Sequence, residues 1–282
     1  MECMPIILLN NICNFRCYHC YVRHASAELP LEKLQQFYHN LMKPTQAKFL
    51  RFAGGEPFMY TRFHELALFL ESIQGQGIDM NFTTNGSLVT DAILDDLKRI
   101  RPNLVKVSLL SLRPDKYREI VGVDHPLSET LWGVDRLMKH FPVGINMTIM
   151  RDTLCDVQPL IDFCLNRGIH DLFFSQLTLA GSGHTIRDKK LTDEEIHEVH
   201  RIIGEVDREQ LNIRYDDGCQ CGFYKDYVLN WDGDVFPCSA LVSYPEFKIG
   251  TCDSSIEEMR KRIGELCVGK KSICFVDDFV TY

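Results

Sequence analysis

The sequence predicts an α/β fold in which short strands alternate with amphipathic helices. Two observations carry this prediction. Short β-branched or apolar runs recur from residue 6 to residue 178, and the segments between them repeat apolar residues at helical spacing. Strands that alternate with helices in this way form parallel β/α units with right-handed connections. From the pattern alone, an open sheet and a partial barrel fit equally well.

Six runs are the expected strands, and they span residues 6–9, 49–52, 79–83, 104–108, 144–150 and 171–178. The helix after the fifth strand has its apolar residues in one stripe, and this stripe makes Cys164 a core residue. Two capping-box pairs mark the starts of later helices, Thr192 with Glu195 and Ser254 with Glu257.

The pattern changes after the sixth strand. Residues 227–238 predict a β-hairpin, because Asp232-Gly233 is a turn signal between two short strand-like runs. We therefore expect a principal domain over residues 1–210 and a small extension, a hairpin followed by a helix, over residues 211–282.

Size and charge limit the classes of function. A chain of 282 residues that is 45% hydrophobic can bury a large core. Its formal net charge of −8 argues against a nucleic-acid backbone as the partner. No apolar run approaches the ~20 residues that span a bilayer, and residues 5–9 are too short for the apolar region of a signal peptide. We expect a cytoplasmic protein that binds neither nucleic acid nor membrane.

Twelve cysteines are the unusual feature of the composition. In a short secreted protein they would indicate disulfides, but this chain is long and shows no export signal. Three of them lie within eight residues near the N-terminus, and six fall between Cys219 and Cys274. Reduced thiols gathered in clusters favour metal binding.

The first cluster, Cys13, Cys17 and Cys20, lies on the loop directly after the first expected strand. Thiolates separated by three and two residues can converge on one small metal centre. Zinc sites usually have a fourth protein ligand and come as two separated pairs, and iron–sulfur clusters normally use four thiolates. Three thiolates on a four-iron cluster would leave one iron open to a further ligand, which is an arrangement for catalysis.

This Cys-x3-Cys-x2-Cys loop resembles the signature of the radical S-adenosylmethionine (SAM) superfamily. Gly54-Gly55-Glu56 follows the second strand and is similar to the family's segment for the methionine amino group of SAM. Two glycines permit close approach of the backbone to a ligand, and a carboxylate pairs with an ammonium group. A resemblance also extends to Asn85, in the turn after the third strand, and to His19, at a position that relatives place near the adenine.

Two further positions resemble SAM contacts of the family. Ser108 ends the fourth strand, where relatives place a polar contact, and Arg118 lies in a stretch that supplies a basic residue for the SAM carboxylate. The run 107–112 is similar to the molybdenum-cofactor cyclase branch, but Leu110 stands where an Asp is usual.

The resemblance covers roughly residues 5 to 180, and it implies a partial (β/α)6 TIM barrel with SAM at the carboxyl-end mouth. It also implies a 4Fe-4S cluster on Cys13, Cys17 and Cys20, which passes an electron to SAM and so generates a 5′-deoxyadenosyl radical. This radical abstracts a hydrogen atom from the substrate. The implied electron donor is a reductase or a flavodoxin-type protein.

The second group of cysteines resembles the opening of the SPASM and twitch extensions. Cys221, Gly233 and Cys238 have the spacing of that opening, but the later cysteine block of a full SPASM domain is missing. This favours a twitch form with an auxiliary iron–sulfur cluster on Cys221, Cys238, Cys267 and Cys274, in which Cys219 can replace Cys221. Thiols without a metal and a structural zinc site are the alternatives.

Catalytic residues are less well indicated. Cys252 is either a small buried residue or a thiol that returns a hydrogen atom to a substrate radical. Arg151 follows the fifth expected strand, Gln176 lies in the sixth, and the pair Asp216-Asp217 comes just before the second group of cysteines. A barrel would place these residues at its mouth, where they could handle protons.

Two functions share this catalytic core. In the first, the enzyme acts on a small molecule such as a sugar, an aminocyclitol or another alcohol, as a dehydrogenase or an epimerase. In the second, it crosslinks or epimerises a ribosomally made peptide. The first cysteine motif begins at residue 13, which leaves no room for a leader-binding domain and slightly favours the small molecule. A non-catalytic iron–sulfur or zinc sensor would explain the cysteines but not Gly54-Gly55-Glu56.

Overall fold

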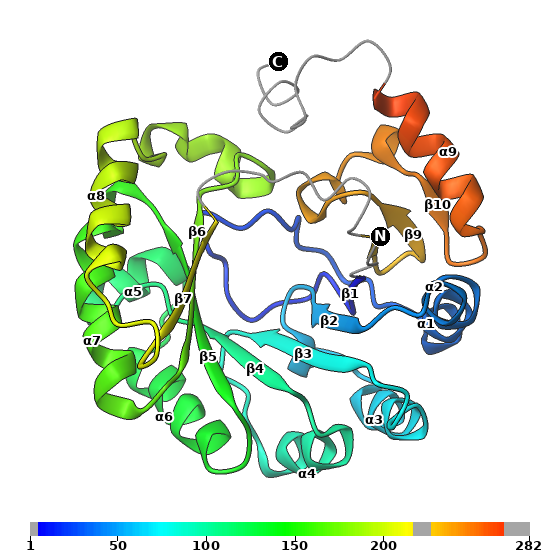
Figure 1. Ribbon diagram of the computed structural model, residues 1–282, viewed down its shortest axis with the longest axis horizontal. Coiled ribbons are helices and arrows are strands. Elements are labelled where there is room, and N and C mark those ends of the chain that lie inside the picture. The colour runs from blue at the N-terminus through cyan, green and yellow to red at the C-terminus, as the bar shows by residue number, and fades with distance from the viewer. Residues whose placement is uncertain (1–4, 217–226, 268–282) are drawn as a thin grey trace.

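One curved sheet organises the chain. The computed structural model describes residues 5–216 and 227–267. In this part, ten strands form a single sheet in the order β10-β9-β8-β1-β2-β3-β4-β5-β6-β7 (Figure 1). The strands are β1 (Ile6–Leu8), β2 (Phe49–Ala53), β3 (Asp79–Thr84), β4 (Leu104–Ser108), β5 (Val143–Ile149), β6 (Asp171–Gln176), β7 (Asn212–Asp216), β8 (Val228–Leu229), β9 (Asp234–Phe236) and β10 (Gly250–Thr251).

Helices follow the strands around the convex side of the sheet (Figure 1). The longer helices are α1 (Leu31–Phe37), α3 (Phe63–Ser72), α4 (Asp91–Ile100), α5 (Pro114–Val121), α6 (Leu127–Met138), α7 (Val157–Arg167), α8 (Asp193–Gly204) and α9 (Ile256–Cys267). The shorter helical segments are η1 (Tyr38–Met42), α2 (Lys43–Thr45), η2 (Pro57–Met59), η3 (Arg151–Asp156), η4 (Gly181–Lys189), η5 (Ser239–Leu241) and η6 (Pro245–Phe247).

The two faces of the sheet differ because side chains alternate along each strand. On the convex face, Phe52 of β2 and Phe82 of β3 are fully buried and stack with ring centroids 4.6 Å apart. The next residue on each strand, Ala53 on β2 and Thr83 on β3, is half-buried and points to the concave side. The convex face is therefore the core, and the concave face is open to bind ligands.

The predicted fold class is confirmed. Strands β1 to β7 are all parallel to their neighbours, and the sheet does not close into a full barrel. All six expected strands form.

A seventh strand, β7, was not expected, and it pairs with β6 in the register Phe173↔Arg214. Its residues are exposed or half-buried at the open edge of the sheet, so they lack the apolar run that marks the other strands.

The predicted hairpin also forms, as β8 and β9. Its turn needs a residue with positive φ, and Gly233 has a φ of 81°. Strand β8 pairs in parallel with β1, in the register Ile6↔Val228, so the hairpin continues the sheet of the barrel. Because β7 also joins this sheet beyond residue 210, the sheet crosses the expected boundary, and the division into two domains stays a prediction.

One helix start differs from the prediction by one residue. The capping box of Thr192 with Glu195 forms at the start of α8, and Cys164 is buried in α7 as expected. Before α9, however, the reciprocal hydrogen bonds join Ser255 and Glu258. The Ser254 hydroxyl accepts a hydrogen bond from the backbone of Thr251 instead.

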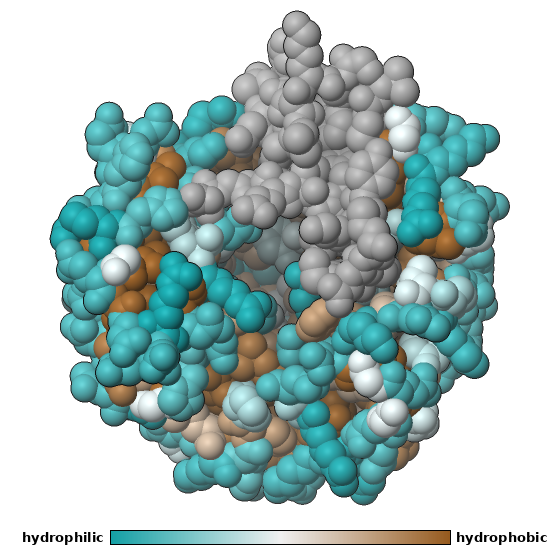
Figure 2. Space-filling model, in the orientation of Figure 1, coloured by the Kyte–Doolittle hydropathy of each residue, from teal (hydrophilic) through white to brown (hydrophobic). Residues whose placement is uncertain are grey.

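The parallel strands end at one rim, and this rim is where ligands bind in such sheets. The loop after β1 crosses the concave side next to it (Figure 1). Seen from the same direction, the surface is largely hydrophilic and a hollow opens near its centre (Figure 2). In the described residues, no helix is both long and apolar enough to cross a membrane.

Candidate active site

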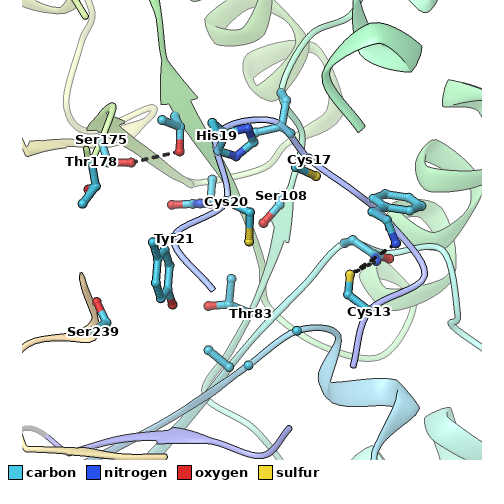
Figure 3. Close-up of a pocket in the computed structure, with 18 of the residues that line it drawn as sticks. Cys13, Cys17, His19, Cys20, Tyr21, Thr83, Ser108, Ser175, Thr178 and Ser239 are labelled. Carbon is cyan, nitrogen blue, oxygen red and sulfur yellow. Dashed lines mark hydrogen bonds between the residues drawn. The ribbon is translucent and has the colours of Figure 1, made fainter. Parts of the chain in front are cut away.

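A cavity of about 360 Å³ lies where the cysteine loop meets the carboxyl ends of the strands. Figure 3 shows the thiols of this loop together with Thr83 and Ser108, which enter the same space from β3 and β4. Polar residues at or just beyond the strand ends also line the cavity. They are Thr83, Thr84, Asn85, Ser108, Asn146, Thr148, Ser175, Gln176, Thr178 and Asp216.

The cysteine loop is fixed from two sides. On one side its backbone bonds to the end of α5, where the N–H of Arg16 donates to the carbonyl of Val121 at 2.8 Å. On the other side the carbonyl of Cys20 accepts from the N–H of Ser182 in η4, also at 2.8 Å. Because backbone groups make these bonds, the path of the loop does not depend on the cysteine side chains themselves.

All three thiols of the loop line the cavity and influence one another. The pKa of Cys13 is raised to about 11, mainly by burial and to a smaller extent by the neighbouring charges of Glu56 and Cys20. Burial also raises the pKa of Cys17, with repulsion from Cys20 and Cys13 as the next causes. Thiolates so close together in a desolvated place need a cation to balance them.

This donor set fits an iron–sulfur cluster better than a single metal ion. In the described part of the chain, no three His, Cys, Asp or Glu side chains converge closely enough to hold one ion, as zinc would require. A four-iron cluster accepts thiolates that are further apart, and three cysteines around one cavity provide them.

The Gly-Gly-Glu segment packs directly against the cysteine loop. The N–H of Gly55 donates to the carbonyl of Asn10 at 2.9 Å, and the N–H of Glu56 donates to the carbonyl of Ile12 at 2.7 Å. A Cβ atom on Gly55 would lie 2.1 Å from the Ile12 oxygen. Gly54 has a φ of 149°, which also favours glycine. The glycines line the cavity, but their tightest contact is with the loop that carries the thiols.

The side chain of Glu56 does not face the cavity. It is fully buried, and it accepts hydrogen bonds from the N–H of Phe58 (3.1 Å), the hydroxyl of Thr84 (2.6 Å) and the N–H of Asn85 (2.7 Å). Burial raises the pKa of this carboxyl to about 7, while the three hydrogen bonds act in the opposite direction. The Glu56 carboxylate is thus held by internal donors in this structure, and its expected pairing with the SAM ammonium stays a prediction.

Asn85 connects this carboxylate to the thiols. Its amide donates to Asn14 Oδ1 at 2.8 Å and approaches Cys13 Sγ at 3.9 Å. Its backbone N–H is one of the donors to Glu56. Asn85 thus links the turn after β3 to the cysteine loop and also lines the cavity.

Two other expected SAM contacts line the cavity. Ser108 is the last residue of β4. His19 lies between two of the thiols, and burial lowers its pKa to about 4, so its ring is neutral at physiological pH. Its Nδ1 atom is buried and has no hydrogen-bond partner within the described residues.

Two expected site residues, Arg118 and Arg151, lie outside the cavity. Arg118 is half-exposed on α5 and contacts Asp124 at 3.4 Å. Arg151 pairs with Glu195 at 3.2 Å on the outer surface. Neither arginine lines the cavity. Both arginines come after a strand in the sequence. Arg118 lies on α5 and Arg151 on η3, and both side chains extend into solvent.

Cys252 is also remote from the cavity. It follows β10, three strands beyond β1 in the sheet order, and packs against α1 and η1. Its Sγ lies 3.5 Å from Gln36 Oε1, and its carbonyl accepts from the amide of Asn40 at 3.1 Å. In this place it is a buried small residue, and the role of hydrogen donor loses its geometric basis.

Of the expected auxiliary ligands, the structure places Cys238. This half-buried thiol follows β9, and the next two residues, Ser239 and Ala240, line the cavity. Burial raises the pKa of Tyr21 on the cysteine loop, and charges on Cys20 and then Cys238 add to this rise, so Cys238 is near that loop. The remaining expected ligands, Cys221, Cys267 and Cys274, and the alternative Cys219 have side chains outside the described residues.

Most of the strand residues that line the cavity were not predicted from the sequence. Asn146 and Thr148 of β5 and Ser175 of β6 are polar residues at alternate positions in otherwise apolar strands. This two-residue period in buried strands is the signal that could have found them. Gln176 and Asp216 were expected at the barrel mouth, and both line the cavity. Asp217 lies outside the described residues.

Comparisons with known proteins agree with this geometry. The sequence model of the Radical SAM superfamily matches residues 7–164. The chain is 23% identical over 259 residues to the tungsten-containing aldehyde ferredoxin oxidoreductase cofactor-modifying protein of Pyrococcus furiosus, across 84% of this chain and 71% of that protein. It is 32% identical over 150 residues to a probable GTP 3',8-cyclase of Thermococcus kodakarensis, across 51% of this chain and 47% of that protein.

Solved structures share the fold at low identity. Streptococcus suis SuiB bound to S-adenosylmethionine superposes with a TM-score of 0.80 and 16% identity, over 95% of this chain and 68% of that chain. The structure of anSMEcpe with bound AdoMet gives 0.75 and 17%, over 94% and 79%. At this identity the similarity establishes the fold only.

A methyl group on Gly55 should displace the cysteine loop. Gly55→Ala places a Cβ against a backbone carbonyl that cannot yield, so we expect a loss of about 1–3 kcal/mol in the free energy of unfolding and less iron after anaerobic reconstitution. The control is Gly204→Ala at the end of α8, where a Cβ meets nothing within 4 Å. Equal iron content in the two variants would contradict this role.

Removing the charge of Glu56 should loosen the same region. Glu56→Gln replaces one of two acceptor oxygens by a donor in a site with three donors, and we expect it to cost about 1–3 kcal/mol in denaturant unfolding. Glu71→Gln is the control, because Glu71 is exposed and pairs with Arg99 on the surface, where ion pairs contribute about 0–1 kcal/mol. A Glu56 variant as stable as this control would show that the buried hydrogen bonds do not hold the loops.

Proposed function

The chain belongs to the radical SAM superfamily, and on this premise we propose that it oxidises a small polar molecule. Membership implies a 4Fe-4S cluster and SAM as cofactors. The observation that best supports the proposal is one cavity that contains three thiols of the cysteine loop and a set of polar side chains at the strand ends, all of them neutral except Asp216. Cys13, Cys17 and Cys20 would hold the cluster there.

When bound, the cluster and SAM supply a 5′-deoxyadenosyl radical that abstracts hydrogen from carbon. The residues of this chain position the reactants and keep water out. Gly54 and Gly55 bring a backbone segment to the cavity, and Ser108 and Asn146 offer neutral hydrogen-bond donors and acceptors. His19, which is neutral because burial lowers its pKa to about 4, adds no charge next to the thiols.

The lining favours a substrate with hydroxyl groups. Thr83 of β3, Thr148 of β5 and Ser175 of β6 present hydroxyls to the cavity, and those of Thr148 and Ser175 lie 3.5 Å apart. A neutral hydroxyl can both donate and accept a hydrogen bond, so it can bind a hydroxyl or an amide of a substrate in either role. A sugar, an aminocyclitol or another alcohol is the substrate class that this lining suits.

The position of Cys252 favours oxidation over epimerisation. An epimerase must return a hydrogen atom to the substrate radical, and a thiol near SAM is the suited donor. Among the described residues, the thiols in the cavity are Cys13, Cys17 and Cys20, which the cluster would occupy. A dehydrogenase needs no such donor, because it loses a proton and passes an electron onward.

An auxiliary cluster would serve as the acceptor of that electron. Cys238 supports this proposal, since it follows β9 beside residues that line the cavity. We propose Cys221, Cys267 and Cys274 as its further ligands.

Modification of a peptide is the second candidate function. Two of the structures with this fold are described as complexes with peptides, SuiB with its precursor peptide SuiA and anSMEcpe with the Cp18Cys peptide. Their identity to this chain is 15% and 16%, so they support the fold and leave the substrate to experiment.

The central test is cleavage of SAM. After anaerobic reconstitution and reduction with dithionite, the protein should convert SAM to 5′-deoxyadenosine, and the triple variant with Cys13, Cys17 and Cys20 replaced by Ala should lose this activity. Cys155→Ala is the control, because Cys155 is exposed and far from the cavity lining. The 5′-deoxyadenosine formed is measured by chromatography. Undiminished cleavage of SAM by the triple variant would refute the proposal.

The auxiliary cluster makes a separate prediction about iron. Two four-iron clusters imply about eight irons per chain, and about four should remain in the triple variant. Replacing Cys238 by Ala in wild type should instead remove the auxiliary iron and keep the first cluster. If the triple variant is folded by circular dichroism and binds no iron, then the C-terminal cysteines hold no cluster.

A further inference from the structure

The thiol of Cys13 accepts N–H groups from two different parts of the chain. The backbone N–H of Phe15, two residues along the loop, donates to its Sγ at 3.3 Å. The side-chain amide of Asn85, 72 residues away in the sequence, directs its nitrogen to the same sulfur at 3.9 Å, a contact at the long end for sulfur. The first donor belongs to the cysteine loop itself, whereas the second reaches it from the turn after β3. Substitution of Asn85 can therefore remove one donor from this thiol and leave the loop sequence unchanged.

The orientation of the Asn85 amide is determined by its other partners. Its Oδ1 accepts from the backbone N–H of Ser87 at 2.9 Å and from the hydroxyl of the same residue at 2.6 Å. Because a backbone N–H can only donate, this end of the amide must be the oxygen. The amide nitrogen then faces the cysteine loop, where one of its two N–H groups donates to Asn14 Oδ1 at 2.8 Å. The other N–H is directed at Cys13 Sγ.

Further contacts hold this amide in place. The Asn14 amide donates to Ser87 Oγ at 2.8 Å, so Asn14, Ser87 and Asn85 close a ring of hydrogen bonds. The backbone N–H of Asn85 donates to the buried carboxylate of Glu56 at 2.7 Å, and its carbonyl accepts from the hydroxyl of Thr130 at 3.4 Å. Asn85 is only 9% exposed. The donor to the thiol is thus preorganised, and it cannot turn away without breaking other hydrogen bonds.

A donor directed at a ligand sulfur affects how readily an iron–sulfur cluster is reduced. Hydrogen bonds to the sulfurs are one determinant of the reduction potential of such clusters. Reduction adds one negative charge, and an N–H group directed at a thiolate stabilises the more negative state. A donor to Cys13 therefore raises the reduction potential of a cluster bound to this thiol.

We propose that Asn85 tunes the reduction potential of the cluster that Cys13, Cys17 and Cys20 would hold, by donating an N–H hydrogen bond to the Cys13 thiolate. This assigns Asn85 to the cluster in place of the SAM contact that the sequence predicted. The inference rests on the part of the proposed function that places a four-iron cluster on the three thiols, and it is independent of the substrate. Asn85 contacts a ligand sulfur and acts on the reaction only through the cluster.

The test is a redox titration of the anaerobically reconstituted full chain without SAM, monitored by electron paramagnetic resonance of the reduced cluster. Asn85→Leu keeps the approximate size of the side chain and removes its N–H groups. We expect the equilibrium constant for one-electron reduction to fall by about tenfold, which corresponds to a potential lower by ~59 mV. The triple variant with Cys13, Cys17 and Cys20 replaced by Ala supplies the signal of any auxiliary cluster for subtraction.

Asn103→Leu is the matched control. The amide of Asn103 donates to Asp79 Oδ1 at 2.9 Å and accepts from the backbone N–H of Met80 at 2.9 Å, so it is bonded at both ends like that of Asn85. Asn103 lies just before β4, at the end of the strand opposite to the cavity. The control variant should therefore keep the wild-type potential.

A second variant covers the case in which Asn85→Leu binds too little iron to be titrated. Asn85→Asp has the same shape and keeps an acceptor for Ser87, but the carboxylate has no N–H group and adds a negative charge near the sulfur. We expect its potential to be at least as low as that of Asn85→Leu, because repulsion adds to the loss of the donor.

Unchanged potentials in both Asn85 variants would overturn the inference. An equal shift in Asn103→Leu would also overturn it, because it would show a general effect of such substitutions on the fold. A shift that appears only after SAM is added would assign the amide to SAM instead. Wild type without a reducible cluster would overturn the proposed function as well. The titration needs neither substrate nor turnover, so SAM cleavage by wild type tests the proposed function separately.

Discussion

The buried carboxylate of Glu56 is the contact on which the catalytic rim depends. It accepts hydrogen bonds from Phe58, Thr84 and Asn85, and so joins the loop after β2 to the end of β3. The carbonyl of the same residue accepts from the side-chain amide of Asn10, where the cysteine loop begins. One residue therefore fixes three loops that follow neighbouring parallel strands. If these loops separated, the buried carboxylate would lose its hydrogen-bond donors. The free-energy cost of a buried carboxylate without donors therefore holds the loops together.

The strands serve the core and the site at the same time. On β5, Ile145, Met147 and Ile149 are fully buried on the convex face, while Asn146 and Thr148 line the cavity. A shift of one residue in register would exchange these two sets and remove both the core and the polar lining. The apolar packing of β5 against the helices thus determines which of its side chains reach the cavity, although Ile145, Met147 and Ile149 do not line it themselves.

The sequence was sufficient where the signal is local. Strand runs, the turn at Gly233 and the cysteine spacing each depend on neighbouring residues, and the structure contains the strands, the turn and a shared cavity for the thiols. Contacts between distant residues could not be predicted in this way. The partners of Glu56 at and just after the end of β3 are 28 and 29 residues away, and no pattern in the sequence shows that an internal hydroxyl and a backbone amide would bond to its oxygens. Cys252 lies beside Gln36, 216 residues earlier in the chain, which only the order of strands in the sheet determines.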